Sequence, residues 1–358
     1  MYGARGLDRE PFPYVNGNGR FDSNEAGDLE YPVGTGYFVA AVARVVHTNV
    51  GFFRLSALGL GIAGALAAIL LVLTAEDRRR ILFFALAPSL VSYAFLNWDL
   101  LAVLAVAAGF WAYTRRAETW AGVALGIGAA TKLYPVIFVP VLALAIMHRD
   151  RRAPTRLLAG AAGAFVAMNL PILLANPSAW WFPWEFQSTR FPNYETVWYF
   201  VSRHAGDGST FWIDSYPGLT SALSLGLFTV AASVLLWREW RREVFRPGVA
   251  SLGVLLLFLI TAKVYSPQYA LWVLPFFVLV RTHGGDFAAF TLADTAVWIA
   301  IAAFLLTVQY QHGDQVLREN LLEAAVFARY AVLGVLLVRS RRMTDNLRLA
   351  EVPAPPVH

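Results

Sequence analysis

The feature of this chain that most restricts its fold is a series of apolar segments separated by short polar turns. Several of these segments have about the 20 residues that a helix needs to cross a bilayer: 51–74, 156–175, 217–237, 286–309 and 321–338. Charged residues make up only 15% of the chain, against about 25% in an average soluble protein. The sequence therefore predicts an all-α polytopic membrane protein.

Shorter apolar segments lie between the long ones, at 81–96, 100–113, 119–132, 135–147, 248–262 and 269–280. They are short for a full crossing, so we expect them to be buried among the longer helices, with recessed polar turns. Counting every segment gives eleven crossings. The stretch from Tyr31 to Val46 is also short and contains Pro32, Gly34 and Gly36, which predicts an interfacial or re-entrant helix.

Basic clusters occur at alternate turns, and the positive-inside rule places those turns in the cytoplasm. The clusters are Arg78–Arg80, Arg115–Arg116, Arg149–Arg152, Arg238–Arg242, Arg281 and Arg339–Arg342. We therefore predict a multi-pass plasma-membrane protein with an external active face and a cytoplasmic C-terminus. Because these clusters account for the net charge of +5, nucleic acid is not expected as a partner.

The predicted organisation has three parts. Residues 1–50 form an external N-terminal loop that includes the interfacial or re-entrant helix, 51–342 form the transmembrane domain, and 343–358 form a cytoplasmic tail. An external loop at 176–216 is rich in Trp, Tyr and Phe, which suits either an interfacial aromatic belt or a platform for a sugar or lipid. An external N-terminus also leads us to expect one more helix upstream of Met1, twelve in all.

Three polar islands fall on the same predicted face: Asn97-Trp98-Asp99, the turn at Lys132, and the turn at Lys263. The 29 basic residues include only these two lysines. An ammonium group binds phosphate as a compact point charge, so we predict that Lys132 and Lys263 contact a phosphorylated lipid. The alternative is that each lysine extends from a helix end to the lipid headgroups.

Asp294 and Arg329 lie inside predicted spans, at matching distances from the inner ends of their helices. An unpaired charge at such a depth is expensive, so we predict a structural ion pair between them. A role in transport is the alternative.

The order of four motifs resembles that of glycosyltransferase family 87: Glu30-Tyr31-Pro32, Asn97-Trp98-Asp99-Leu100, Ala130-Thr131-Lys132-Leu133-Tyr134-Pro135, and Lys263 followed by Ser266-Pro267-Gln268-Tyr269. The resemblance covers nearly the whole chain. This family consists of polyprenyl-phosphate-mannose-dependent α-mannosyltransferases of the GT-C superfold. The resemblance implies a GT-C-like bundle and an inverting, metal-independent transfer of mannose or another hexose. The donor would be a polyprenyl-phosphate sugar, the acceptor a glycolipid or glycan at the outer face, and no cofactor is implied.

The resemblance also implies roles for particular residues. Contacts to the donor phosphate fall to Lys132, Lys263, Tyr134, Tyr265 and Gln268, whereas Asn97, Trp98 and Asp99 shape the cavity. Enzymes of this kind usually place the catalytic base in the first external loop, after a first transmembrane helix. We therefore expect the base either upstream of Met1 or among the carboxylates of the N-terminal segment, with Glu30 and Asp28 as candidates. Glu30 is the only one within a matching motif, and its alternative role is a loop carboxylate bonded to backbone.

A secondary transporter or lipid flippase is the competing interpretation, because such proteins also use broken helices and charges within the membrane. Against it, the chain shows no internal repeat beyond the two lysine motifs, and the polar islands gather at one face instead of the midplane. A membrane scaffold without chemistry would leave the two lysine motifs unexplained.

Overall fold

The computed structural model describes residues 29–204, 216–310 and 313–349, and every regular element in those ranges is a helix. Five helices are long and apolar enough to cross a membrane: α3 (Asn49–Thr74), α9 (Pro154–Ala175), α13 (Pro217–Trp240), α16 (Gly284–Tyr310) and α17 (Gln315–Ser340). They coincide with the five long segments of the sequence, so the predicted all-α polytopic membrane architecture is confirmed.

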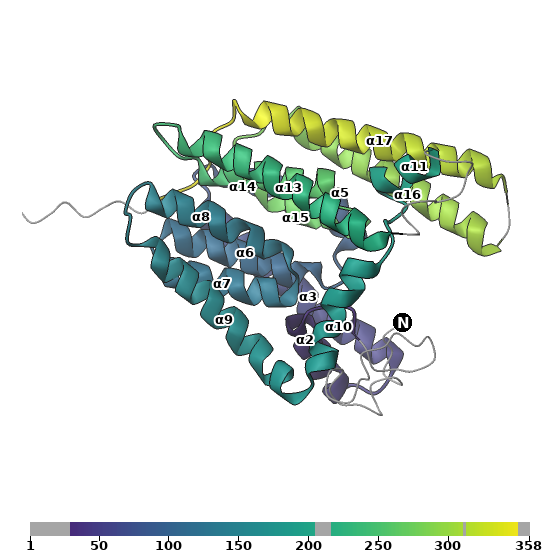
Figure 1. The fold of residues 1–358 in the computed structure, drawn as a ribbon, viewed down its shortest axis with the longest axis horizontal. Coiled ribbons are helices and arrows are strands. Elements are labelled where there is room, and N and C mark those ends of the chain that lie inside the picture. Colours follow the sequence, from purple (N-terminus) through teal and green to yellow (C-terminus); the bar gives the residue numbers. More distant parts are fainter. Residues whose placement is uncertain (1–28, 205–215, 311–312, 350–358) are drawn as a thin grey trace, which may run out of the picture.

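The shorter apolar segments form shorter helices: α6 (Asp99–Thr114), α7 (Glu118–Thr131), α8 (Phe138–Met147), α14 (Pro247–Thr261) and α15 (Ala270–Leu279). The 3-10 turns η2 (Tyr134–Ile137) and η3 (Pro267–Tyr269) lead into α8 and α15. All residues of α15 are buried, as expected for a helix enclosed by others. Figure 1 shows α6 to α9 packed as one group and α13 to α17 as another, with α10 (Pro177–Thr189) between them.

The segment 81–96 does not form the single helix that its apolar composition predicts. It is divided into the 3-10 turn η1 (Arg78–Ile81) and two short helices, α4 (Leu82–Ala85) and α5 (Pro88–Tyr93). Pro88 explains the break, because proline has no N–H to donate and favours an extended conformation in the residue before it. Ala87 indeed has an extended backbone, with ψ of 125°. The prediction of one continuous helix over 81–96 is therefore wrong, and the segment is a broken helix instead.

The N-terminal helix α2 (Val33–Val45) packs on α3, α7 and α9. Thr35 Oγ1 donates a hydrogen bond to the carbonyl of Thr131 at the end of α7, and Tyr37 donates to the carbonyl of Met168 on α9. Gly34 allows this approach, since a Cβ there would lie 2.6 Å from Thr131 Oγ1. The residues just before α2 are thereby held close to the end of α7.

The aromatic connection at 176–216 is partly helical in its described residues. It contains α10 and α11 (Val197–His204), and Asn176 caps α10 by accepting a hydrogen bond from the backbone N–H of Ala179. Trp180 donates to Asn169, and Trp198 donates to the carbonyl of Thr261. These indole groups therefore hold the connection against the helix bundle.

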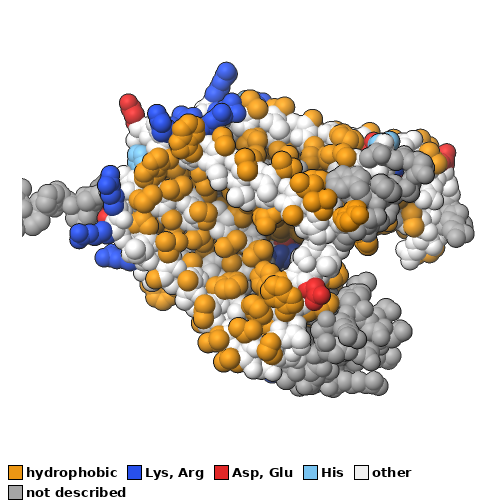
Figure 2. Space-filling view, viewed as in Figure 1, with side chains coloured by type: hydrophobic (Ala, Val, Ile, Leu, Met, Phe, Trp, Pro, Cys, Tyr) orange, Lys and Arg blue, Asp and Glu red, His pale blue; other side chains and the backbone are white. Residues whose placement is uncertain are grey.

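The described part of the predicted tail, residues 343–349, lies against the end of the bundle opposite to the aromatic connection. Isolated bridges join Leu347 to Ala75 and Asp345 to Val280, and the Asn346 side chain is fully buried. Figure 2 shows basic side chains gathered at one end of the face in view, beyond a broad apolar surface; they are arginines, since both lysines line the cavity described below. This distribution is the one expected for a protein whose middle lies in lipid.

Helices α7 and α9 pack closely, because glycines permit their backbones to touch. A Cβ on Gly122 or Gly126 would overlap the carbonyl oxygen of Leu157 or Ala161, respectively. Small residues at helix interfaces allow such close packing in membranes. The spacing of Gly122 and Gly126 therefore serves helix packing.

Gly122→Ala is expected to destabilise the protein by about 1–3 kcal/mol, because the added methyl group forces α7 and α9 apart. Gly163→Ala on α9 is the matched control, since a Cβ there meets nothing within 4 Å. Thermal unfolding in detergent, followed by tryptophan fluorescence, measures both. Equal melting temperatures for the two variants would contradict the packing role of Gly122.

Candidate functional site

A cavity of about 350 Å³ opens where the ends of α7 and α14 meet the segment before α2, the C-terminal half of α10 and the first half of α13. Six of the residues that sequence reasoning selected line it: Glu30, Asn97, Lys132, Tyr134, Lys263 and Gln268. Asp99, Trp98 and Tyr265 do not line it. The structure thus gathers residues from four motifs that are far apart in the sequence.

Lys132 is bound to Asp99 in a buried ion pair. Its Nζ lies 2.9 Å from both carboxylate oxygens, and the Asp99 side chain has no exposure to solvent. The indole of Trp272 donates a further hydrogen bond of 2.7 Å to Asp99 Oδ1. Asp99 therefore sits behind Lys132 as its counter-ion, and its shaping of the cavity is indirect.

Aromatic rings surround the ammonium group of Lys132. Nζ lies 5.3 Å from the ring centre of Tyr31, 5.6 Å from that of Tyr269 and 5.9 Å from that of Trp272. Trp272 is the middle ring of a stack, 4.0 Å from Tyr134 and 3.7 Å from Tyr269. These contacts favour a fixed ammonium position beside the cavity.

Asn97 and Trp98 position Tyr31. Asn97 Nδ2 lies 2.7 Å from the Tyr31 hydroxyl oxygen, to which it donates, and the Trp98 ring packs edge-on against the Tyr31 ring. The Asn-Trp-Asp motif therefore supports two neighbours at once, Tyr31 through its first two residues and Lys132 through the third. Asn97 itself reaches the cavity wall.

Lys263 has no carboxylate partner among the described residues. Its Nζ donates to the backbone carbonyls of Ser188, at 3.0 Å, and Arg190, at 2.6 Å, which lie at the C-terminal end of α10. An ammonium group has three N–H donors, so these two hydrogen bonds leave one N–H that can bind a ligand. Burial, and secondarily the charge of Arg190, lower the pKa of Lys263 to about 8.

The segment after α10 is joined to the Lys263 turn. Asn193 donates its backbone N–H to the carbonyl of Lys263 and its side-chain amide to Ser266, and it accepts a hydrogen bond from Arg190 Nη2. Arg190 also lines the cavity. Two cationic groups, Lys263 and Arg190, are therefore held on one wall, and neither forms an ion pair with an acidic residue in the part of the chain that the structure describes.

Glu30 is partly buried at the cavity wall, and its carboxylate forms no hydrogen bond or ion pair with any residue that the structure describes. The alternative role for Glu30 was a loop carboxylate bonded to backbone, and no described backbone group bonds to it. Asp28, the second candidate base, lies outside the described residues.

Tyr265 lies away from the cavity, beneath Arg329. The guanidinium carbon of Arg329 is 3.7 Å from the centre of the Tyr265 ring, and both side chains are fully buried. Arg329 Nη1 is 3.8 Å from Asp294 Oδ1, and Nη2 donates to the carbonyl of Glu195. Tyr265 is thus placed to support Arg329 instead of a ligand in the cavity.

Two residues that sequence reasoning missed are prominent at this site. Trp272 follows Tyr269 by three positions, a spacing that puts both on one helix face, and this was the available signal. For Arg190 the sequence contains no pattern that marks it as a site residue, apart from its place in the aromatic connection. In the described residues no three His, Cys, Asp or Glu side chains come together as they would around a metal ion.

The comparison with known families decides what kind of protein this is. Residues 30–262 match the sequence model of glycosyltransferase family 87. The chain belongs to this family. It is therefore a membrane glycosyltransferase, and the matched range contains Glu30, Lys132 and the aromatic connection.

The chain was also compared with curated proteins and with solved structures. Curated proteins give no significant match. Among solved structures, the crystal structure of ArnT from Cupriavidus metallidurans bound to undecaprenyl phosphate aligns with a TM-score of 0.44 at 13% identity, covering 87% of this chain and 68% of ArnT. The assignment to glycosyltransferase family 87 rests on the sequence match.

Neutralising one member of the buried pair is expected to cost more stability than neutralising both. Asp99→Asn leaves Lys132 buried without a counter-ion, at a cost of about 3–5 kcal/mol, whereas Asp99→Asn with Lys132→Met removes both charges. Thermal unfolding of the two singles and the double measures the coupling.

The exposed pair between Glu76 and Arg281 provides the control. Glu76→Gln is expected to change stability by less than about 1 kcal/mol. Additive losses in the Asp99 and Lys132 variants would contradict a coupled pair.

Proposed function

We propose that this glycosyltransferase moves mannose from a polyprenyl-phosphate donor to a hydroxyl group of a glycolipid or glycan at the outer membrane face, with inversion at the anomeric carbon and without a metal. One observation carries the proposal. A single cavity brings together the carboxylate of Glu30 and the cations Lys263 and Arg190, and none of the three has an oppositely charged partner among the described residues. The same cavity is lined by Glu30, Asn97 and Lys132, which lie within the range that matches the family.

The carboxylate and the cations suit the two ends of an inverting displacement. The oxygen of the acceptor hydroxyl attacks the anomeric carbon, and Glu30 accepts the proton that this hydroxyl loses. The bond from that carbon to the phosphate oxygen breaks on the opposite side, and its electron pair leaves with polyprenyl phosphate. Lys263 and Arg190 stabilise the charge that develops on the phosphate, whereas Lys132, neutralised by Asp99, fixes the shape of the cavity.

The remaining walls suit the rest of the substrates. Leu225, Phe228 and Phe258 provide an apolar wall for the first isoprene units of a polyprenyl chain, and Trp184 provides a ring on which a sugar can pack. Gln268 and the hydroxyl of Tyr134, which is buried without a hydrogen bond, supply polar atoms near the stacked rings. Recognition of the donor thus combines an anion site with an apolar surface.

The orientation follows from the arginine clusters. The cavity lies at the end of the bundle opposite to Arg149–Arg152 and Arg238–Arg242. By the positive-inside rule the clusters face the cytoplasm, so the cavity faces outward and the C-terminus is cytoplasmic. We accordingly place the enzyme in the plasma membrane, with its donor reached from the outer leaflet.

A transporter or flippase is the second candidate, because Asp294 and Arg329 form a buried charged pair between α16 and α17. Their contacts favour a structural role. Arg329 holds the carbonyl of Glu195, two residues from Asn193, which is itself bonded to the Lys263 turn. The pair therefore supports the wall that carries Lys263 and Arg190.

Transfer of labelled mannose from polyprenyl-phosphate-mannose, in membranes containing a glycolipid acceptor fraction, tests the proposal. Lys263→Ala is expected to lower kcat/KM by about 10²–10³-fold, the usual effect of removing one group that stabilises developing charge. Glu30→Gln is expected to lower kcat by about 10²–10⁴-fold.

Glu185→Gln is the matched control, because Glu185 is exposed on α10 and does not line the cavity. It is expected to retain full transfer. Full activity in both Lys263→Ala and Glu30→Gln would overturn the assigned site, and donor uptake without transfer would favour the transporter.

The pH dependence of donor binding provides an independent check on Lys263. A phosphodiester donor keeps its single negative charge across neutral and alkaline pH, whereas Lys263, with a pKa of about 8, loses its charge as the pH rises past that value. The KM for the donor is therefore expected to rise above pH 8, by up to tenfold per pH unit. Lys263→Met should remove this rise, and an unchanged profile in that variant would exclude Lys263 as the titrating group.

A further inference from the structure

A second cavity opens at the basic end of the molecule. Its volume is about 510 Å³, and it is enclosed by the C-terminal turns of α13 and α17 and by α14. Its charged residues are Arg238, Glu239, Arg242 and Arg341. The other walls are apolar and belong to helix positions farther into the bundle, such as Leu235.

Glu239 is the single carboxylate of this cavity and is fully engaged. It is buried, Arg242 Nε lies 3.0 Å from Oε1, and Arg246 approaches its two oxygens at 2.6 and 3.0 Å. The guanidinium groups of Arg238 and Arg341 form no hydrogen bond or ion pair within the described chain. The cavity therefore carries an excess of positive charge.

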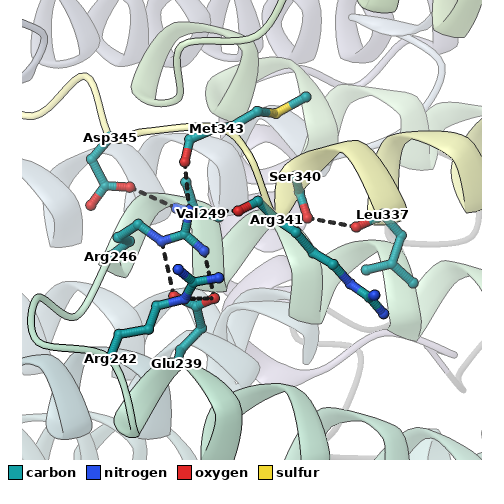
Figure 3. Close-up of polar contacts among 9 residues, drawn as sticks. All are labelled: Glu239, Arg242, Arg246, Val249, Leu337, Ser340, Arg341, Met343 and Asp345. Atoms are coloured by element: carbon teal, nitrogen blue, oxygen red, sulfur yellow. Dashed lines mark hydrogen bonds and ion pairs between the residues drawn. The ribbon is translucent and has the colours of Figure 1, made fainter.

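The charged rim is fixed in place by the helix ends. Arg246 bridges from Glu239 to the carbonyls of Arg341, at 3.1 Å, and Met343, at 2.6 Å, which lie at the end of α17. Figure 3 shows this bridge, with the Arg341 side chain extending away from the Glu239 cluster. Asp345 joins the segment after α17 to the start of α14, because it accepts a hydrogen bond from the N–H of Val249. The arginines thus project from a braced junction of three helices.

We propose that this cavity binds the headgroup of an anionic phospholipid, in the leaflet that the positive-inside rule makes cytoplasmic. A guanidinium group donates paired hydrogen bonds to phosphate oxygens, and basic pockets between membrane helices at this side recognise acidic lipids. The site goes beyond the proposed transfer reaction, because its arginines lie at the end of α13 opposite to the part that lines the donor cavity.

The surroundings indicate a lipid instead of a soluble phosphate. Val234 lines the cavity and is also 43% exposed on the outer face of α13, where Val230 is 66% exposed. Acyl chains can therefore run along this face while the phosphate lies at the arginines. Trp237 is exposed on α13 between Val234 and the arginines. The Arg241 guanidinium lies 5.5 Å from its ring, and tryptophan is typical of the membrane interface.

Native mass spectrometry of the purified chain tests the proposal, using phosphatidylglycerol and phosphatidylcholine added in equal amounts. The chain is expected to retain phosphatidylglycerol preferentially. Arg238→Gln with Arg341→Gln should weaken that binding by about thirtyfold, since each arginine near a membrane surface contributes roughly one factor of five. Both side chains are exposed, so folding is expected to be preserved.

Arg79→Gln with Arg151→Gln is the matched control, because it removes two exposed arginines that do not line the cavity. This double variant should bind phosphatidylglycerol within about twofold of the parent chain. Equal losses in the two doubles, or no preference for phosphatidylglycerol in the parent chain, would overturn the site. Displacement of the lipid by equimolar glycerol 3-phosphate would overturn the lipid assignment in favour of a soluble phosphate ligand.

Discussion

The buried ion pair between Lys132 and Asp99 is the interaction on which the active-site end of the molecule depends. Asp99 is the first residue of α6 and Lys132 follows the last residue of α7, so each charge lies at the helix end whose dipole favours it. A buried pair is worth little unless its remaining hydrogen-bonding capacity is satisfied. Trp272 supplies that bond to Asp99, and through it the pair ties α6 and α7 to α15 and the stacked rings.

The two lysines have different environments despite their similar sequence motifs. Lys132 is neutralised by a carboxylate, whereas Lys263 is held by carbonyl groups beside Arg190 and has no carboxylate partner among the described residues. In the proposed reaction this difference divides their roles. Lys263 and Arg190 supply the positive charge that a phosphate leaving group needs, while Lys132 and its aromatic neighbours fix the shape of the cavity.

Much of the fold could be predicted because it depends on local patterns. Long apolar segments give α3, α9, α13, α16 and α17, and polar motifs before prolines mark the helix starts around the cavity. The failure over 81–96 was also local, because Pro88 interrupts an otherwise suitable apolar segment.

The side-chain partners at the site could not be predicted, because they are set by packing between distant segments. Asp99 was expected at the cavity wall and instead lies behind Lys132, and Tyr265 was expected at the phosphate and instead lies under Arg329. Arg190 reaches the cavity because α10 folds back across the helix ends. In each case a short motif identified an important residue, but only the folded chain shows which group it contacts.

A structure of the enzyme with a non-transferable phosphonate analogue of the polyprenyl-phosphate sugar would test the central claim most directly. We expect a phosphonate oxygen within hydrogen-bonding distance of Lys263 Nζ, the sugar near Trp184, and Glu30 on the face of the anomeric carbon opposite to the phosphonate. A phosphonate bound outside this cavity, or one within it that contacts neither Lys263 nor Arg190, would contradict the proposed roles of these residues.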